Sequence, residues 1–259
     1  MEKLTIIKTG GNVVDNAALL DKVLDIFACL PGHKLLVHGG GKLATQMAER
    51  LGLKAQMVDG RRITDAPMLQ IVTMVYGGDI NKRMVAMLQA KGCNALGLTG
   101  ADGNLIPAGR RHEAGCDWGF VGDFDWGNIN TRLLKGFLTA GMAPVVAPLT
   151  HDMEGSMLNT NADTIAAGLA CALAEHFTTT LIYCFEKKGV LRDVEDADSV
   201  ISTIRLKDYE CLKAEGVIAD GMLPKLDNAF VALQSGVQQV HICLATDIND
   251  AENGTTLCL

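Results

Sequence analysis

The chain has 259 residues, of which 48% are hydrophobic and 20% charged, and its formal net charge is −7. Disordered chains combine low hydrophobicity with high charge, so this composition indicates a folded protein. The acidic balance argues against a protein that holds nucleic acid through its phosphates, although it leaves room for local basic pockets. The longest apolar runs, such as 143–149, are far shorter than the roughly 20 residues that a membrane span needs.

The eight cysteines are spread along the chain without a close pair. This spacing argues against a zinc ribbon or a redox-active pair and is typical of reduced thiols inside a cytoplasmic protein. The N-terminal residues enter a β-like run at once, which leaves no room for a signal peptide. Together these features predict a cytoplasmic globular enzyme.

Apolar, β-rich runs alternate with helical patterns along almost the whole chain. The runs predicted as strands are 4–8, 34–38, 95–98, 144–147, 180–184 and 239–244. The stretches predicted as helices are 16–29, 42–52, 66–91, 128–141, 161–176, 206–215 and 224–236. Apolar runs without strict alternation indicate strands covered on both faces, so we expect a three-layer α/β/α sandwich with a mostly parallel central sheet.

The Gly-, Asp- and Trp-rich stretch 100–127 interrupts this alternation and is interpreted as hairpins or a lid. No Pro- or Ser-rich linker divides the sequence. We therefore expect a single domain with two lobes, about 1–176 and about 177–259.

Two predicted strands end in glycines, at Gly10-Gly11 and at Gly39-Gly40-Gly41. Glycine lets backbone N–H groups approach an anion closely, and the N-terminus of the helix that follows adds partial positive charge. In an open α/β sheet, ligands bind at the carboxyl ends of the strands. These turns therefore predict an anion site, against the alternative of simple tight turns.

The glycine triplet does not match a Walker A loop, because Leu43 follows Lys42 at the place where Ser or Thr is needed. Residues 39–44 do match the weak dinucleotide fingerprint, with Asp59 at a tolerable distance for a ribose contact. An NAD(P)-dependent oxidoreductase is therefore the alternative function.

Charged side chains stand beside these turns and at the starts of predicted helices. Lys8 lies in an apolar strand just before the first glycines, Asp163 follows a helix start, and Lys225 opens a late helix. Each has a structural alternative: a snorkelling lysine, a dipole-favoured acid and a solvated surface charge. Together with Arg61 and Arg62, they supply cations around one central carboxylate, which suits phosphoryl transfer better than hydride transfer.

Seven segments, in order along nearly the whole chain, carry a more specific pattern. They are IIKTGG (6–11), VHGGG (37–41), GRRITD (60–65), GLTGADGN (97–104), FVGD (120–123), NTNAD (159–163) and DGMLPK (220–225). In these segments the chain resembles the amino acid kinase family, and in particular its acetylglutamate kinases. The segments 60–65 and 159–163 favour this branch over the carbamate, aspartate and uridylate kinases.

The resemblance implies an ATP-dependent kinase that phosphorylates the γ-carboxylate of an N-acyl-L-glutamate, N-acetyl- or N-succinyl-L-glutamate, in arginine biosynthesis. It implies that the first lobe binds the acyl-glutamate and the second binds ATP. Mg²⁺ would enter with ATP, held mainly by phosphate oxygens, and no protein metal ligand is expected. Relatives inhibited by arginine carry an additional N-terminal helix that links dimers into a hexamer. The first strand here begins by Leu4, so we expect a homodimer that arginine does not inhibit.

The same resemblance implies roles for individual residues. Lys8 and Lys225 would contact the moving phosphoryl group, and Asp163 would orient both lysines. Residues implied to bind the acyl-glutamate are Gly40, Gly41, Arg62, Asn159 and Asn161. Residues implied to bind the nucleotide are Gly10, Gly11, Glu186, Gly189, Leu191, Val217, Ile218 and Ala219. The N–H groups of the four glycines would serve the phosphates and the reacting carboxylate.

The chain departs from the family pattern in three places. The strand 180–184 is followed by FEKKG (185–189), where the family has a small hydroxyl residue and Asp-Val before glycine. Arg61 replaces an apolar residue, and the stretch 116–126 is more aromatic than the family pattern, so the acyl pocket need not be shaped for acetyl. A non-catalytic binding protein with the same fold is a further alternative, although such a protein would be expected to lose the lysine pair.

Overall fold

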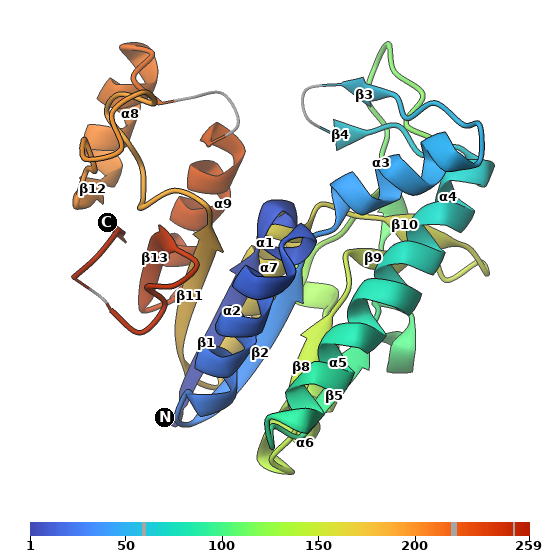
Figure 1. Cartoon of the computed structure of the whole chain (residues 1–259), viewed down its shortest axis with the longest axis horizontal. Coiled ribbons are helices and arrows are strands. Elements are labelled where there is room, and N and C mark those ends of the chain that lie inside the picture. The colour runs from blue at the N-terminus through green and yellow to red at the C-terminus, as the bar shows by residue number, and fades with distance from the viewer. Residues whose placement is uncertain (59–60, 219–221, 251) are drawn as a thin grey trace.

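The computed structural model describes residues 1–58, 61–218, 222–250 and 252–259 (Figure 1). Its centre is an eight-stranded sheet with the order β12-β14-β13-β11-β1-β2-β8-β5. Neighbouring strands are parallel except β13 and β14. The strands of this sheet are β1 (Lys3–Thr9), β2 (His33–His38), β5 (Ala95–Leu98), β8 (Ala143–Val146), β11 (Thr178–Phe185), β12 (Thr203–Arg205), β13 (Gln239–Leu244) and β14 (Thr255–Cys258). The predicted mostly parallel α/β sheet is confirmed.

Helices cover both faces of the sheet, as expected for a three-layer sandwich (Figure 1). One face packs against α1 (Gly11–Asp15), α2 (Ala17–Cys29), α3 (Gly41–Arg50), α4 (Ala66–Val72) and α5 (Asn81–Ala90). The other face packs against α6 (Thr131–Thr139), α7 (Ala162–Ala174), α8 (Leu206–Ala214) and α9 (Leu223–Gln234). None of the described helices has the length and apolarity that a membrane span requires.

The helix predicted over 66–91 is continuous but not uniform. Asp65 caps its start by accepting a 2.9 Å hydrogen bond from the N–H of Met68. Between α4 and α5, the segment η1 (Thr73–Ile80) is π-helical. π-Helical turns are rare and occur frequently at functional sites. This one carries Tyr76, a buried residue whose place in the site is described below.

The interrupted stretch 100–127 contains a short hairpin, as expected. It pairs β6 (Gly109–Arg110) with β7 (Gly122–Asp123), between the 3₁₀ turns η2 (Asp102–Asn104) and η3 (Trp126–Asn128). Two further antiparallel pairs stand nearby in Figure 1: β3 (Met57–Val58) with β4 (Arg61–Arg62), and β9 (Leu149–His151) with β10 (Met157–Asn159).

The boundary predicted between the two lobes falls just before β11. This strand pairs directly with β1, so the sheet continues across residues 176–177. The assignment of one lobe to each substrate stays a prediction.

Candidate active site

Three charged side chains from distant parts of the chain meet at the carboxyl end of the sheet. Lys8 lies near the end of β1, Asp163 in the first turn of α7, and Lys225 in the first turn of α9. Nζ of Lys8 lies 2.7 Å from Oδ1 of Asp163, and Nζ of Lys225 donates a 2.5 Å hydrogen bond to Oδ2. Lys8 and Asp163 are only 7% and 8% exposed. The structure thus brings the three predicted catalytic residues together, and we call them the lysine–aspartate cluster.

The members of this cluster set each other's protonation. Burial alone would raise the pKa of Asp163, but the charges of Lys8 and Lys225 and their hydrogen bonds lower it to about 2. Burial lowers the pKa of Lys225, and the charge of Asp163 opposes that shift. A carboxylate with so low a pKa is a weak base at neutral pH. Asp163 is therefore suited to holding cations rather than to taking a proton.

The two glycine turns lie side by side. A Cβ atom placed on Gly11 would be 3.8 Å from the amide nitrogen of Gly41 and 3.9 Å from that of Gly40. Gly11 and Gly41 are the first residues of α1 and α3, where N–H groups have no acceptor within the helix. The N–H of Gly10 instead donates to the carbonyl of Cys184 at 3.2 Å. This hydrogen bond ties the turn to β11, and the expectation that the amide of Gly10 serves a phosphate stays a prediction.

Gly40 has a further constraint. Its φ is +157°, and a Cβ atom there would collide with Ile80 and lie 3.2 Å from Cδ1 of Tyr76. Glycine is therefore required where the second turn packs against η1.

Two cavities meet at these turns, and Gly41 lines both. The first, here called the arginine cavity, has a volume of about 190 Å³, and its lining includes Gly40, Arg61, Arg62, Tyr76, Asn159 and Asn161. The second, the lysine cavity, has a volume of about 330 Å³, and its lining includes Gly11, Lys42, Glu186 and the lysine–aspartate cluster. Two ligands placed in these cavities would face each other across Gly41.

Arg62 is a buried cation whose hydrogen-bonding capacity is only partly used. Nη2 donates to the carbonyl of Gly41 at 2.9 Å and to Oγ1 of Thr45 at 2.8 Å. Nη1 is buried and has no acceptor among the described residues. Burying an unpaired charge is costly, and a guanidinium binds carboxylates with particular strength. The arginine cavity is therefore built to receive an anion.

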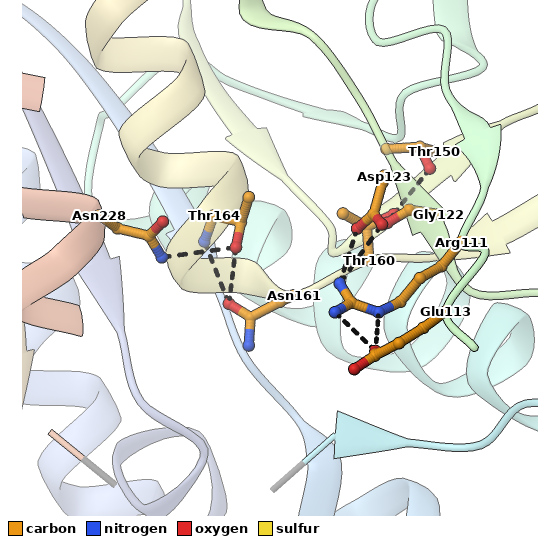
Figure 2. Close-up of polar contacts among 9 residues, drawn as sticks. All are labelled: Arg111, Glu113, Gly122, Asp123, Thr150, Thr160, Asn161, Thr164 and Asn228. Carbon is orange, nitrogen blue, oxygen red and sulfur yellow. Dashed lines mark hydrogen bonds and ion pairs between the residues drawn. The ribbon is translucent and has the colours of Figure 1, made fainter. Parts of the chain in front are cut away.

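Asn159 and Asn161 come just before α7 in the chain, and both line the arginine cavity. Nδ2 of Asn159 donates to Oγ1 of Thr64 at 2.9 Å. Oδ1 of Asn161 accepts from the N–H groups of Asp163 and Thr164 at 2.8 and 3.0 Å, as Figure 2 shows for Thr164. Asn161 thus caps α7, and through this cap it fixes the turn that carries Asp163.

The arginine cavity also contains a carboxylate, Asp123, which is paired from outside (Figure 2). Nη1 of Arg111 lies 3.2 Å from Oδ1 of Asp123, and Nη2 lies 3.0 Å from Oε2 of Glu113. The ring of Trp118 lies beneath this guanidinium, 5.2 Å from its central carbon. Arg111 therefore offsets negative charge that would otherwise face an anionic ligand.

Three of the residues predicted to bind the nucleotide, Gly10, Gly11 and Glu186, line the lysine cavity. Oε1 of Glu186 accepts a 2.5 Å hydrogen bond from Nδ2 of Asn12, which links the end of β11 to α1.

Of the remaining predicted nucleotide residues, the four that the structure describes do not line this cavity. Gly189 is packed between loops, where a Cβ atom would lie 2.8 Å from Oγ1 of Thr255. Leu191 and Ile218 are buried, and Val217 packs against the core. Ala219 lies outside the described residues. The roles of these residues stay predictions.

The sequence reasoning missed Thr45, Tyr76 and Arg111. Thr45 comes four residues after Gly41, so one helical turn places its hydroxyl above the glycine turn, and this spacing could have identified it. Tyr76 reaches the cavity from a π-helical segment, which no pattern in the sequence predicts. Arg111 gains its role only through pairing with Asp123 beside the short hairpin.

A sequence profile of the amino acid kinase family matches residues 3–244. The chain belongs to the amino acid kinase family. The acetylglutamate kinase of Cytophaga hutchinsonii is 57% identical over 254 residues, covering 98% of this chain and 96% of that protein. The acetylglutamate kinase of Phocaeicola vulgatus is 54% identical over 256 residues, covering 99% and 98%. The predicted resemblance is confirmed, and with it the predicted class of enzyme, a phosphotransferase.

Two solved structures of other proteins have folds similar to this one. N-acetylglutamate synthase from Neisseria gonorrhoeae superposes with a TM-score of 0.83 at 21% identity, covering 98% of this chain, which spans 59% of that one. Giardia carbamate kinase superposes with a TM-score of 0.66 at 14% identity, covering 98% of each chain. At these identities the likeness concerns the fold alone, and it confirms the predicted fold class.

Proposed function

We propose that this amino acid kinase transfers the γ-phosphoryl group of ATP to the γ-carboxylate of N-acetyl-L-glutamate. The observation that carries the proposal is the meeting of two cavities at Gly41, one lined by Arg62, whose buried Nη1 has no acceptor among the described residues, and one with the lysine–aspartate cluster. The names of the relatives from Cytophaga and Phocaeicola support the choice of acceptor.

The two substrates are assigned to the cavities by their charges. The acyl-glutamate would occupy the arginine cavity, with a carboxylate on Nη1 of Arg62 and polar contacts from Asn159 and Asn161. The triphosphate would occupy the lysine cavity, beside the free N–H of Gly11 and the two lysines of the cluster. The arginine cavity is lined by residues of the first lobe, and the lysine cavity by residues of both lobes, with Tyr183, Glu186 and Lys225 from the second. The proposed assignment therefore puts the acceptor in the first lobe and the triphosphate between the two lobes.

The proposed reaction needs no catalytic base. A γ-carboxylate with an ordinary pKa of about 4.3 is already ionised at neutral pH. One of its oxygens attacks the γ-phosphorus, the bond from that phosphorus to the bridging oxygen of ADP breaks, and ADP leaves with the electron pair. The protein's task is to bring two anions together and to stabilise negative charge that spreads in line. Lys8, Lys225 and the glycine amides supply positive charge at that point.

A magnesium ion that enters with ATP fits the donor chemistry of the lysine cavity. Both oxygens of Asp163 face ammonium groups, so the oxygens available to a cation are mainly those of the phosphates. When bound, the ion would offset phosphate charge. Glu186, at the edge of the cavity, is the side chain placed to approach it.

The position of Arg61 supports N-succinyl-L-glutamate as a second candidate acceptor. It lines the arginine cavity together with Arg62, so the cavity presents two guanidinium groups. N-acetyl-L-glutamate brings two carboxylates, of which one must face the phosphoryl donor. N-succinyl-L-glutamate brings a third, which Arg61 would pair.

The test measures ADP release from Mg·ATP with N-acetyl- and N-succinyl-L-glutamate in parallel, with acyl phosphate trapped by hydroxylamine. Release that depends on either acyl-glutamate, together with hydroxamate formation, is the expected result. The ratio of the two kcat/KM values assigns the acyl group. Absence of release with both compounds would contradict the proposal, and reduction of NAD(P) would favour an oxidoreductase. The homodimer and the cytoplasmic location stay predictions, the first of which light scattering tests.

A further inference from the structure

The lysine cavity contains a third lysine that the proposed function does not yet use. Lys42 follows Gly41 in the first turn of α3 and lines the cavity together with Lys8 and Lys225. Unlike the buried Lys8, it is exposed to solvent. The sequence pattern around it is not a Walker A loop, so sequence alone assigns it no phosphate contact.

Lys42 differs from the other two lysines in its partners. Lys8 and Lys225 share the carboxylate of Asp163. Among the described residues, Lys42 forms no ion pair within 4.0 Å. Burial raises the pKa of the Asp15 carboxyl, and the charge of Lys42 opposes that shift through space, without a direct contact. Lys42 is therefore a cation in the cavity wall without a fixed partner.

The lysine cavity is lined by more cationic than anionic side chains. Its cations are Lys8, Lys42 and Lys225, and its anions are Asp163 and Glu186. Glu186 already accepts a hydrogen bond from Asn12, and Asp163 is shared by two ammonium groups. The cavity therefore carries one excess positive charge, and Lys42 is its lysine without an ion pair among the described residues.

The backbone places Lys42 where the two cavities join. Its neighbour Gly41 lines both cavities and lies against Gly11 of the other glycine turn. A lysine side chain is a flexible stem with a compact charge, which suits contact with a phosphate whose position changes during a reaction. Lys42 therefore lines the lysine cavity at the residue next to the one that both cavities share.

We propose that Lys42 binds the terminal phosphate of the nucleotide, as a third cation beside the lysine–aspartate cluster. This inference rests on the proposed function, because it takes the occupant of the lysine cavity to be a nucleoside triphosphate. With the terminal phosphate at the junction beside Gly41, the α- and β-phosphates would lie farther from Lys42. Lys42 therefore discriminates a triphosphate from a diphosphate.

The experiment measures binding without turnover. Isothermal titration calorimetry, with Mg²⁺ present, gives the Kd of the non-hydrolysable analogue adenylyl imidodiphosphate and the Kd of ADP. Wild type is compared with Lys42→Met, with Lys42→Arg, and with Lys22→Met, which removes one exposed lysine on α2 outside the cavity. Because Lys42 is exposed, its variants are expected to fold, and circular dichroism checks this.

Lys42→Met is expected to weaken binding of the triphosphate analogue about tenfold. This is the smallest effect expected from the loss of one charge-assisted hydrogen bond. ADP binding should weaken at most about threefold by the same reasoning, because only longer-range attraction is lost. Lys42→Arg should restore most of the affinity, and Lys22→Met should change neither Kd. Equal losses for both nucleotides, or no loss, would overturn the proposal.

The binding data separate this inference from the proposed reaction. If the acyl-glutamates fail to release ADP while the triphosphate-selective loss is observed, the proposed acceptor is wrong and the role of Lys42 stands. If ADP release occurs but Lys42→Met binds both nucleotides as wild type does, the proposed reaction stands and the proposed role of Lys42 is wrong. Failure of wild type to bind either nucleotide would overturn both.

Discussion

Arg111 pairs at 3.2 Å with Asp123, a carboxylate that lines the arginine cavity, although Arg111 itself does not line it. Without this pairing, the carboxylate would face an anionic substrate with its charge less compensated. Arg111→Gln is therefore expected to raise the KM for the acyl-glutamate about twofold to fivefold, the range for an exposed ion pair. The kcat should change little, because the contact is remote from the phosphoryl group.

A double variant tests this explanation. Adding Asp123→Asn removes the charge that Arg111 offsets, so the double variant should recover most of the lost affinity. Steady-state kinetics of the two single variants and the double variant give the coupling. If Asp123→Asn fails to restore KM, Arg111 acts by holding the hairpin and not through charge.

Asp163→Asn is expected to lower kcat about 10²- to 10³-fold, the cost of removing one electrostatic element of a preorganised site. The substitution keeps size and some hydrogen bonding but removes the charge that positions Lys8 and Lys225. Because those lysines matter most in the transition state, the KM values should rise much less. Steady-state kinetics with each substrate varied in turn measure both.

The double variant Asp163→Asn with Lys225→Ala should lose less than the product of the single effects, because the two residues act as a unit. If Asp163 were only a favourable charge at a helix start, its loss would cost about 0.3–1 kcal/mol of stability. Near-normal kcat with a lowered melting temperature would therefore argue for that simpler role.

Arg62→Lys should raise the KM for the acyl-glutamate at least about tenfold, with kcat nearly unchanged, because a lysine cannot reproduce the planar fork of donors. The buried Nη1 loses its ligand contact, and Nη2 loses its bonds to Gly41 and Thr45. Arg61→Lys is the matched control in the same cavity. A larger KM effect at Arg61 would move the carboxylate contact to that residue.

Stability should fall on mild acidification because of His38. Burial lowers the pKa of this imidazole to about 4, against the hydrogen bond to the carbonyl of Gly39, which raises it. The unfolded chain, with an ordinary pKa of about 6.5, binds the proton first. The buried, neutral His38 therefore makes its full contribution to the free energy of unfolding above about pH 6.5. This contribution, about 3 kcal/mol in total, is lost as the pH falls toward 4.

Urea unfolding at pH 7.0, 5.5 and 4.5 measures this loss. His38→Gln should flatten the dependence, and the exposed His112→Gln should leave it as in wild type. Should His38→Gln fold poorly, the imidazole titration of wild type followed by NMR provides the same information. A His38 that titrates near 6.5 would contradict the prediction.

The strands and helices that sequence predicted well are those with long apolar runs. β11 and α7 each bury most of their residues, so their composition shows their place in the sandwich. β12 and β14 were missed because they are only three and four residues long. Polar residues, Thr203 and Arg205 in β12 and two threonines in β14, interrupt the apolar pattern of each strand. The π-helical segment was predicted as ordinary helix, because its composition is that of one.

For the site, sequence identified residues whose chemistry is unusual for their place. Lys8 is a lysine in an apolar strand, and Asp163 is an acid at the start of an apolar helix. Each has a structural alternative, so they were identified together and through the family motifs. Thr45 and Arg111 are ordinary residues that gain a role only from neighbours brought close by folding. The position of Gly189 depends on the path of a loop, and no local pattern determines that path.

The lysine–aspartate cluster also bears on when the protein gains activity during synthesis. Its members come from β1, α7 and α9, so a growing chain that has not yet released residue 225 from the ribosome holds Lys8 and Asp163 but no second lysine. Domains fold as their sequence emerges, and contacts between distant residues form late. A nascent chain can therefore complete much of the first lobe while remaining inert toward ATP, and the ability to transfer phosphate arrives only after Lys225 has left the ribosome.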